Sequence, residues 1–136
     1  MNNHYLTGTC YCGDIKYAIS GEFSSQCFCH CRSCQLAGGA PFLAWGTLDR
    51  ALFDITHGTL KVINKSTGVT RGFCDQCGTS LTYLHDDRPG ELDICLATID
   101  EPGLVRPDYH LWVADKLPWI SIDDGLPQYQ EWRSGQ

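Results

Sequence analysis

The feature that most constrains this chain is a stretch of eight residues, Cys27 to Cys34, that contains four cysteines and one histidine. Packing in a hydrophobic core does not explain so many thiols at such close spacing. Sulfur atoms at positions i, i+2 and i+5 converge on one point only if the backbone curls around it, and a metal ion is the usual occupant of that point. The stretch therefore predicts a metal-binding loop, around which the rest of the chain builds a scaffold.

Two further cysteine pairs, Cys10-x-Cys12 and Cys74-x-x-Cys77, each lie on a turn that contains a glycine. Two such turns facing each other give a closed tetrahedral site of four thiolates, with no coordination position left for a substrate. We therefore predict a structural zinc ion at Cys10, Cys12, Cys74 and Cys77, with free buried cysteines as the alternative. Such a site would make roughly 10 kcal/mol or more of binding energy available to folding.

Cys29, Cys31 and Cys34 offer three ligands without an obvious fourth, which is typical of an open, catalytic zinc site. A zinc ion with three thiolates is a weak Lewis acid, better suited to holding a thiolate delivered by a substrate than to making a hydroxide. The chemistry to expect is therefore at sulfur. In the alternative interpretation, Cys27 or His30 completes a second structural site.

The spacing alone leaves the register of the ligands open, because Cys27-x-Cys29 repeats the interval of Cys29-x-Cys31. If the residues before Cys29 form a strand, Cys27 points off that strand as a small hydrophobic residue or a spare thiol. Cys95 lies within an apolar run and is expected in the core rather than at a metal.

Composition narrows the class of protein. A chain of 136 residues, 43% of them hydrophobic, is expected to form one domain over residues 1–136. No transmembrane run and no signal peptide are visible, so we expect a cytoplasmic protein whose nine cysteines stay reduced and bind metal. The net charge of −6 argues against a nucleic-acid partner, and the absence of an apolar span argues against a membrane.

Short alternating or apolar runs bounded by turn residues predict a mainly β fold of antiparallel strands, with no long helical period. A short helical turn is expected at 33–37. The expected strands are a hairpin over 5–20 that turns at 10–14, followed by 23–28, 41–48, 53–56, 59–64, 69–73, 80–84, 91–99 and 107–113.

Several motifs carry a resemblance to a known family. They are Gly8-Thr9-Cys10-Tyr11-Cys12-Gly13, Cys29-His30-Cys31-Arg32-Ser33-Cys34, Phe73-Cys74-Asp75-Gln76-Cys77-Gly78-Thr79, His110-Leu111-Trp112-Val113 and Asp123-Asp124-Gly125-Leu126-Pro127. Together they resemble the glutathione-dependent formaldehyde-activating enzyme family, which is shared with centromere protein V. The resemblance extends over the expected core of the domain, about 8–129.

The resemblance implies a β-tent fold of packed antiparallel sheets with two zinc ions (Zn²⁺) per chain. It places the catalytic zinc on Cys29, Cys31 and Cys34, which also selects the register, and the structural zinc on the two cysteine pairs. The named activity of the family is the addition of glutathione to formaldehyde, which gives S-(hydroxymethyl)glutathione and is classed as a carbon–sulfur lyase reaction.

A few other polar residues are candidates for the site. His110, flanked by Tyr109 and Trp112 on the last expected strand, could be a catalytic general base or a wall residue beside the metal. The alternative is a half-buried histidine bonded to backbone. Arg71 and Lys116 could bind a carboxylate of glutathione, or could be ordinary solvated charges.

These observations favour a zinc-dependent carbon–sulfur lyase that binds a thiol at the open coordination position and adds formaldehyde or another small carbonyl compound to it. Its partners would be the small-molecule thiol and the carbonyl substrate. The competing hypothesis is a non-enzymatic zinc module that binds another protein.

Overall fold

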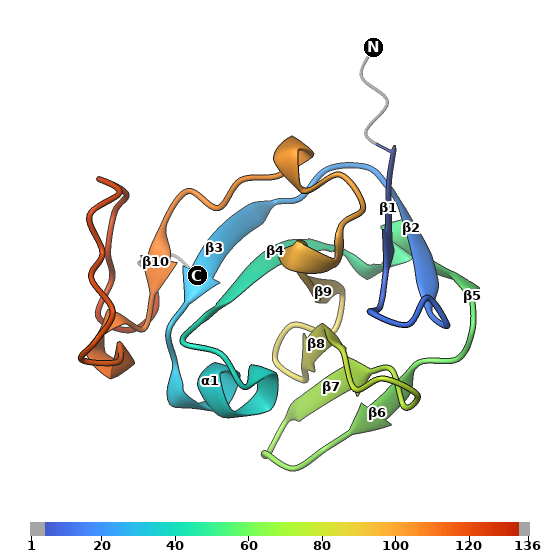
Figure 1. Ribbon diagram of the computed structural model, residues 1–136, viewed down its shortest axis with the longest axis horizontal. Coiled ribbons are helices and arrows are strands. Elements are labelled where there is room, and N and C mark those ends of the chain that lie inside the picture. Colours follow the sequence, from blue (N-terminus) through green and yellow to red (C-terminus); the bar gives the residue numbers. More distant parts are fainter. Residues whose placement is uncertain (1–4, 134–136) are drawn as a thin grey trace.

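Two β-sheets make up the computed structural model, which describes residues 5–133 (Figure 1). The smaller sheet has three antiparallel strands in the order β1-β2-β5, namely β1 (Tyr5–Thr9), β2 (Lys16–Ser20) and β5 (Phe53–His57). The β1–β2 hairpin that the sequence predicts over residues 5–20 is therefore confirmed.

The larger sheet has seven strands in the order β10-β3-β4-β9-β8-β7-β6. Its middle consists of β3 (Ser25–Cys29), β4 (Leu43–Asp49) and β9 (Glu91–Cys95). One side is completed by β10 (His110–Leu111), and the other by β8 (Ser80–His85), β7 (Val69–Phe73) and β6 (Lys61–Ile63). Figure 1 shows β10 and the C-terminal segment beyond β3, on the opposite side of the molecule from the smaller sheet.

Helical structure is short. The one α-helix among the described residues, α1 (Arg32–Gly38), confirms the helical turn expected after the cysteine stretch. Residues 5–133 also contain four single 3₁₀ turns: η1 (Arg50–Leu52), η2 (Leu96–Thr98), η3 (Pro102–Leu104) and, after the last strand, η4 (Val113–Asp115). The fold is thus mainly β, as predicted.

Two predicted strands are shorter than expected. The run 91–99 leaves the sheet after Cys95, where η2 begins. The run 107–113 contributes only β10, and this strand pairs with β3 in parallel rather than antiparallel. Pro107 has no N–H to donate to a sheet, and Trp112 has a φ of 57°, which takes the chain out of the extended conformation.

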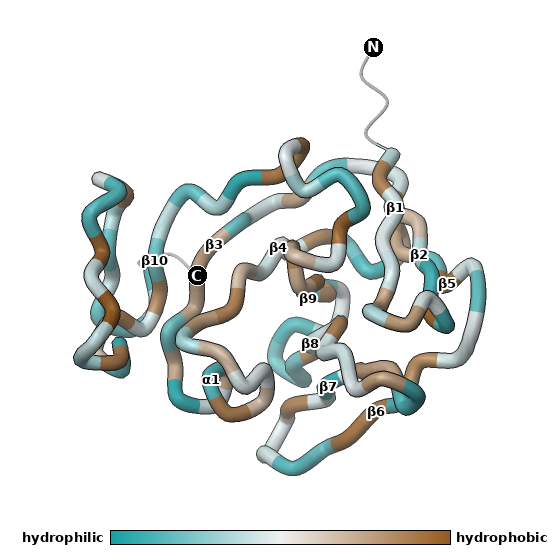
Figure 2. The backbone as a smooth tube through the Cα atoms, in the orientation of Figure 1, coloured by the Kyte–Doolittle hydropathy of each residue, from teal (hydrophilic) through white to brown (hydrophobic). Residues whose placement is uncertain are grey.

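Buried side chains form two clusters. The first lies between the two sheets and includes Ile15, Tyr17, Ile19, Leu48, Leu81, Leu92, Ile94 and Ile99. The second surrounds the cysteine stretch and consists of Cys27, Cys29, Cys34, Trp45, Cys95, Tyr109 and Leu111. Figure 2 shows hydrophobic stretches along β4 and β9, in the middle of the larger sheet, and hydrophilic stretches in connecting loops.

No helix within residues 5–133 is both long enough and apolar enough to cross a membrane. The predicted domain boundaries, 1–136 with a core of about 8–129, extend beyond the described residues and stay a prediction.

Candidate metal centres and cavity

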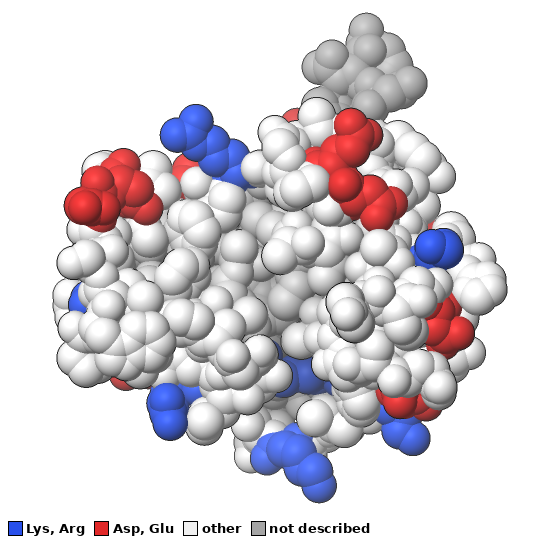
Figure 3. All heavy atoms as spheres, in the orientation of Figure 1, with Lys and Arg blue, Asp and Glu red and all other residues white. Residues whose placement is uncertain are grey.

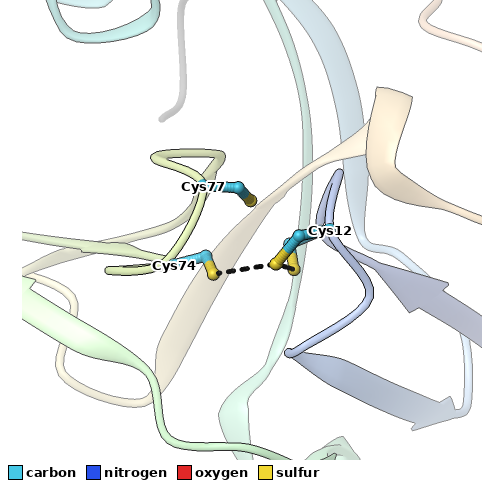
Figure 4. A group of neighbouring side chains, drawn as sticks. Cys12, Cys74 and Cys77 are labelled. Carbon is cyan, nitrogen blue, oxygen red and sulfur yellow. Dashed lines mark hydrogen bonds between the residues drawn. The ribbon is translucent and has the colours of Figure 1, made fainter.

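The first cysteine group joins two loops that belong to different sheets. Cys10 and Cys12 lie in the β1–β2 loop, while Cys74 and Cys77 lie in the β7–β8 loop. Their four sulfur atoms all lie within 4.8 Å of one another. Figure 4 shows the side chains of Cys12, Cys74 and Cys77 extending from the two loops toward a common point. The structure therefore brings together the four residues that the sequence predicts for one site.

A glycine in each loop makes this approach possible. Gly13 and Gly78 both have a φ of 82°, a conformation that other residues rarely adopt. In the second loop the N–H of Gly78 donates to the carbonyl oxygen of Cys74 at 2.7 Å, which closes the turn. Each turn thus reverses the chain within a few residues of its two cysteines, with the glycine directly after the second one.

The spacing of the sulfurs fits a tetrahedral zinc ion. The Sγ atoms of Cys10 and Cys12 are 3.7 Å apart, and those of Cys12 and Cys74 are 3.8 Å apart. Zinc–sulfur bonds of about 2.3 Å in a tetrahedron place the sulfurs about 3.8 Å from each other. The backbone N–H groups of Ile15 and Gln76 donate to the sulfurs of Cys10 and Cys74 at 3.2 and 3.4 Å. Such donors favour thiolates, the form that binds zinc.

Whereas burial raises the pKa of Cys74 despite its donor, Cys77 has the clearest preference for the thiolate in this group. The side chain and backbone of Thr79 hydrogen-bond to its sulfur and lower the pKa of Cys77 to about 6. Within this group Cys10 and Cys74 are buried and Cys12 is exposed. The group therefore lies at the surface of the molecule, where it connects the two sheets.

The second cysteine group forms where β3 ends and α1 begins. Cys29 is the last residue of β3, Cys31 is the N-cap of α1, and Cys34 lies in its first turn. The three sulfur atoms lie within 4.8 Å of one another. As an N-cap, the sulfur of Cys31 accepts a hydrogen bond from the N–H of Cys34 at 3.3 Å. The change from strand to helix thus supplies the curl of the backbone that the sequence requires.

The three thiols depend on one another for their protonation. Hydrogen bonds from Cys29 and Cys31 lower the pKa of Cys34 to about 3, and a smaller contribution comes from the positive charge of Arg71. Hydrogen bonds with Cys31 and Cys34 raise the pKa of Cys29 in turn. A shared cation relieves this competition because it replaces the protons between the sulfurs, and soft thiolates are ligands that zinc accepts. The donor set therefore fits a metal ion.

A cavity of about 1080 Å³ opens next to the second group. Cys29, Cys31 and Cys34 line it, whereas none of the four cysteines of the first group does. Its walls are rich in aromatic side chains, namely Trp45, Tyr83, Tyr109, Trp112 and Trp132. Ligand sites are usually concave, largely apolar and of about 300–1,000 Å³. The three-cysteine group thus has room beside it for a small molecule, and the four-cysteine group takes no part in lining this cavity.

The remaining two cysteines stand apart from both groups. Cys27 lines the same cavity from β3, but its sulfur is not among the three that converge. Burial raises the pKa of Cys27 to about 12, so this residue behaves as a neutral thiol. Cys95 is buried opposite Trp45 on the neighbouring strand, as expected for a core residue.

His110 does not line the cavity. Its neighbours Tyr109 and Leu111 do, so the His110 side chain lies on the other face of the β3–β10 pair. There its Nδ1 is 2.9 Å from Nε2 of His30, and its Nε2 is 2.8 Å from a carboxylate oxygen of Asp124. The catalytic role of His110 stays a prediction, and the structure gives it hydrogen-bond partners away from the cavity.

Sequence reasoning missed this network, although a signal for it exists. On an extended strand, side chains alternate between faces, so a histidine next to a cavity-lining tyrosine points away from that cavity. Arg71, proposed from the sequence as a ligand contact, does line the cavity, while Lys116 does not. The charged residues Arg88 and Asp93 also line it and were not anticipated.

Comparisons with known proteins found a matching family and a similar fold. A family model described as glutathione-dependent formaldehyde-activating enzyme matches residues 5–115. A crystal structure of a Rhodobacter sphaeroides protein is similar in fold, with a TM-score of 0.60 and 22% sequence identity over 74% of this chain and 91% of that chain. No curated protein sequence matches significantly.

The matched residues 5–115 cover most of the chain and include both cysteine groups. On this match, the chain belongs to the glutathione-dependent formaldehyde-activating enzyme family.

Proposed function

We propose that this protein is a zinc-dependent carbon–sulfur lyase of the cytoplasm that adds a glutathione-like thiol to formaldehyde or another small carbonyl compound. Membership of the family supports a glutathione-dependent, formaldehyde-activating type of function in general. The observation that carries the finer proposal is the contrast between the two cysteine groups. The three-cysteine group opens into a cavity of about 1080 Å³, while the four-cysteine group joins two loops at the surface.

Two zinc ions per chain follow from this contrast. Cys10, Cys12, Cys74 and Cys77 would hold a structural ion, since four thiolates fill a tetrahedral shell. The three-cysteine group would hold the second ion with one position open toward the cavity. A zinc ion bound there would keep the sulfur of the substrate deprotonated at neutral pH.

The cavity itself would orient the reactants. In the reaction, the substrate thiol loses its proton and its sulfur forms a bond to the carbonyl carbon. The π electrons of the C=O bond move to oxygen, which takes up a proton and becomes the new hydroxyl group. Aromatic walls such as Trp45 and Tyr83 limit water around the carbonyl compound, and positioning two reactants together lowers the entropic part of the barrier.

His110 would act on this site indirectly. Its partner His30 is fully buried and connects the ligands Cys29 and Cys31 in the chain. Fixing the ring of His30 therefore fixes the backbone between two metal ligands. We propose His110 as a positioning residue rather than as a group that touches the substrate.

Exchange spectroscopy by NMR tests the proposed function. The zinc-loaded protein is mixed with glutathione and ¹³C-formaldehyde, and the rate of exchange between free and adduct forms is compared with the spontaneous rate. We expect the protein to accelerate this exchange and Cys31→Ser to abolish the acceleration. Cys95→Ala, which changes a buried cysteine outside both groups, should retain it.

A panel of other thiols and aldehydes extends the same measurement to related substrates. Protein that holds two zinc ions and accelerates no thiol–aldehyde pair would contradict the lyase proposal. That result would favour the competing hypothesis of a non-enzymatic zinc module that binds another protein.

A further inference from the structure

A row of polar side chains crosses the floor of the cavity. The row consists of five residues on five adjacent strands, each paired in register with the next: Ser25 on β3, Thr47 on β4, Asp93 on β9, Tyr83 on β8 and Arg71 on β7. Directly paired residues point to the same face of a sheet, and all five line the cavity. The cavity thus has a polar floor in addition to the three-cysteine group.

Most of the polar groups in this row already have hydrogen-bond partners within the protein. Thr47 donates to one carboxylate oxygen of Asp93 at 2.6 Å, and Arg88 donates to the other at 3.2 Å. Arg88 also forms an ion pair with Glu91 at 2.8 Å. The charge of Arg88 is therefore balanced by two carboxylates of the protein itself.

Arg71 differs from Arg88 in having no such balance. Within residues 5–133 no carboxylate lies within 4.0 Å of its guanidinium nitrogens. Its Nη1 is buried and has no hydrogen-bond partner there. Its Cζ lies 5.0 Å from the centre of the Tyr83 ring, which holds the guanidinium in place. A guanidinium fork that is held in place and whose buried Nη1 has no acceptor is suited to a planar anion.

The position of Arg71 also relates it to the three-cysteine group. Trp45 belongs to the same buried cluster as Cys34, and its ring centroid is 6.0 Å from that of Tyr83. Arg71 therefore lies two aromatic rings away from the sulfur cluster, along the wall of one cavity. Figure 3 shows a basic side chain in a recess near the lower centre of this face, surrounded by uncharged surface.

We infer that Arg71, held by Tyr83, is a carboxylate-binding subsite that selects thiol substrates carrying a carboxylate group. The inference rests on the proposed function for the role of the thiol, since the substrate sulfur would reach the three-cysteine group while its carboxylate pairs with Arg71. Thiols without a carboxylate would leave the Arg71 donors unpaired and would bind less well.

Binding of S-methylglutathione to the zinc-loaded protein, measured by calorimetry, tests the subsite. This probe keeps both carboxylates of glutathione but has a blocked sulfur, so its affinity does not depend on lyase chemistry. A charge-assisted pair contributes enough that Arg71→Gln should weaken binding at least about tenfold. Arg71→Lys, which keeps the charge but not the fork, should lose less. Arg106→Gln, which changes an exposed arginine outside the cavity, should have no effect.

The diethyl ester of the same probe removes its carboxylate charges. The unmodified protein should bind the ester at least about tenfold more weakly than the acid, and Arg71→Gln should cause no further loss with the ester. This comparison uses the native chain, so it decides the question even if a variant misfolds. Three results would each overturn the subsite: the unmodified protein binds acid and ester with equal affinity, Arg71→Gln weakens the binding of both by the same factor, or the acid does not bind at all. Normal binding without acceleration of any thiol addition would instead contradict the proposed lyase and leave the subsite standing.

Discussion

At the scale of single residues, the backbone around each cysteine determines what its sulfur can do. Cys77 lies before a glycine with a φ of 82°, and Thr79 hydrogen-bonds to its sulfur. Cys31 caps a helix and thereby lies next to Cys34. Cys95 precedes the 3₁₀ turn η2 without a side-chain capping hydrogen bond, has no second cysteine near it in the chain, and is a core residue. The same residue type therefore has different roles because the local conformation differs.

Cys77→Ser should prevent stable folding. The variant removes one of four thiolates from a group that connects the two sheets. Structural zinc contributes roughly 10–16 kcal/mol in small zinc-dependent folds, which is comparable to the whole stability of a domain, about 5–15 kcal/mol. Soluble yield, zinc content and melting temperature are the measurements. A soluble variant with an unchanged melting temperature would show that these cysteines do not form a folding site.

Tyr17→Phe should change how stability depends on pH. Tyr17 is buried and its hydroxyl donates to Oγ1 of Thr98 at 2.7 Å. Burial raises the pKa of Tyr17, so the folded chain retains a proton that the unfolded chain releases near pH 10. The unfolded state then binds fewer protons, and the free energy of unfolding falls as the pH rises above about 10.

At pH 8 the free energy of unfolding of the variant should be about 1 kcal/mol lower, because the hydrogen bond is missing. Between pH 9 and pH 11 its free energy of unfolding should decline less than that of the unmodified protein. Urea unfolding at several pH values measures both effects, with Tyr5→Phe, a change at an exposed ring, as the control. An unchanged alkaline decline would mean that Tyr17 is not the group responsible.

At the scale of elements, β3 separates two environments by the alternation of its side chains. Ser25, Cys27 and Cys29 face the cavity, whereas Phe28 stacks on His110 on the other side. The helix α1 then fixes the end of this strand. Gln35 of α1 is buried, and its side-chain amide donates to the carbonyl oxygens of His30 and Asp115 at 2.8 and 3.0 Å.

Gln35→Leu should therefore loosen the loop that carries the three cysteines. The substitution keeps most of the side-chain volume but leaves the carbonyls of His30 and Asp115 without their donor, at a cost of about 1–3 kcal/mol. We expect a lower melting temperature and a faster loss of one zinc ion to a chelator. Gln130→Leu, at an exposed position, is the matched control. If both variants behave alike, the amide of Gln35 does not hold the loop.

At the scale of the whole molecule, the two cysteine groups occupy different places in the fold. The four-cysteine group connects the β1–β2 loop of the smaller sheet to the β7–β8 loop of the larger one. The three-cysteine group lies within one sheet and its adjoining helix, beside the cavity. Removing a metal ion from each should therefore have different consequences for the fold.

A mild chelator should remove the two zinc ions in separate steps. Three thiolates with one exchangeable position admit a competing ligand without first breaking a zinc–sulfur bond, so the ion beside the cavity should leave first and the fold should persist. A thiol substrate should protect that ion. Cys31→Ser should stay folded and bind one zinc ion fewer. A colorimetric indicator measures the release of zinc, and circular dichroism measures whether the fold persists. Simultaneous loss of both ions would contradict the catalytic assignment.

The amino-acid sequence by itself indicated the cysteine groups and most of the strands. Cysteine spacing and glycine position are local properties, so Cys10, Cys12, Cys74 and Cys77 could be grouped without a structure. For the second group the spacing left the register open, and the family resemblance selected Cys29, Cys31 and Cys34, whose sulfurs the structure brings together. Only the tertiary structure decided what surrounds these groups. The pairing of His110 with His30 and Asp124 depends on a two-residue parallel strand that no local pattern specifies. The unpaired Arg71 likewise depends on the register of five strands, because the neighbours of a side chain in a sheet come from segments distant in sequence.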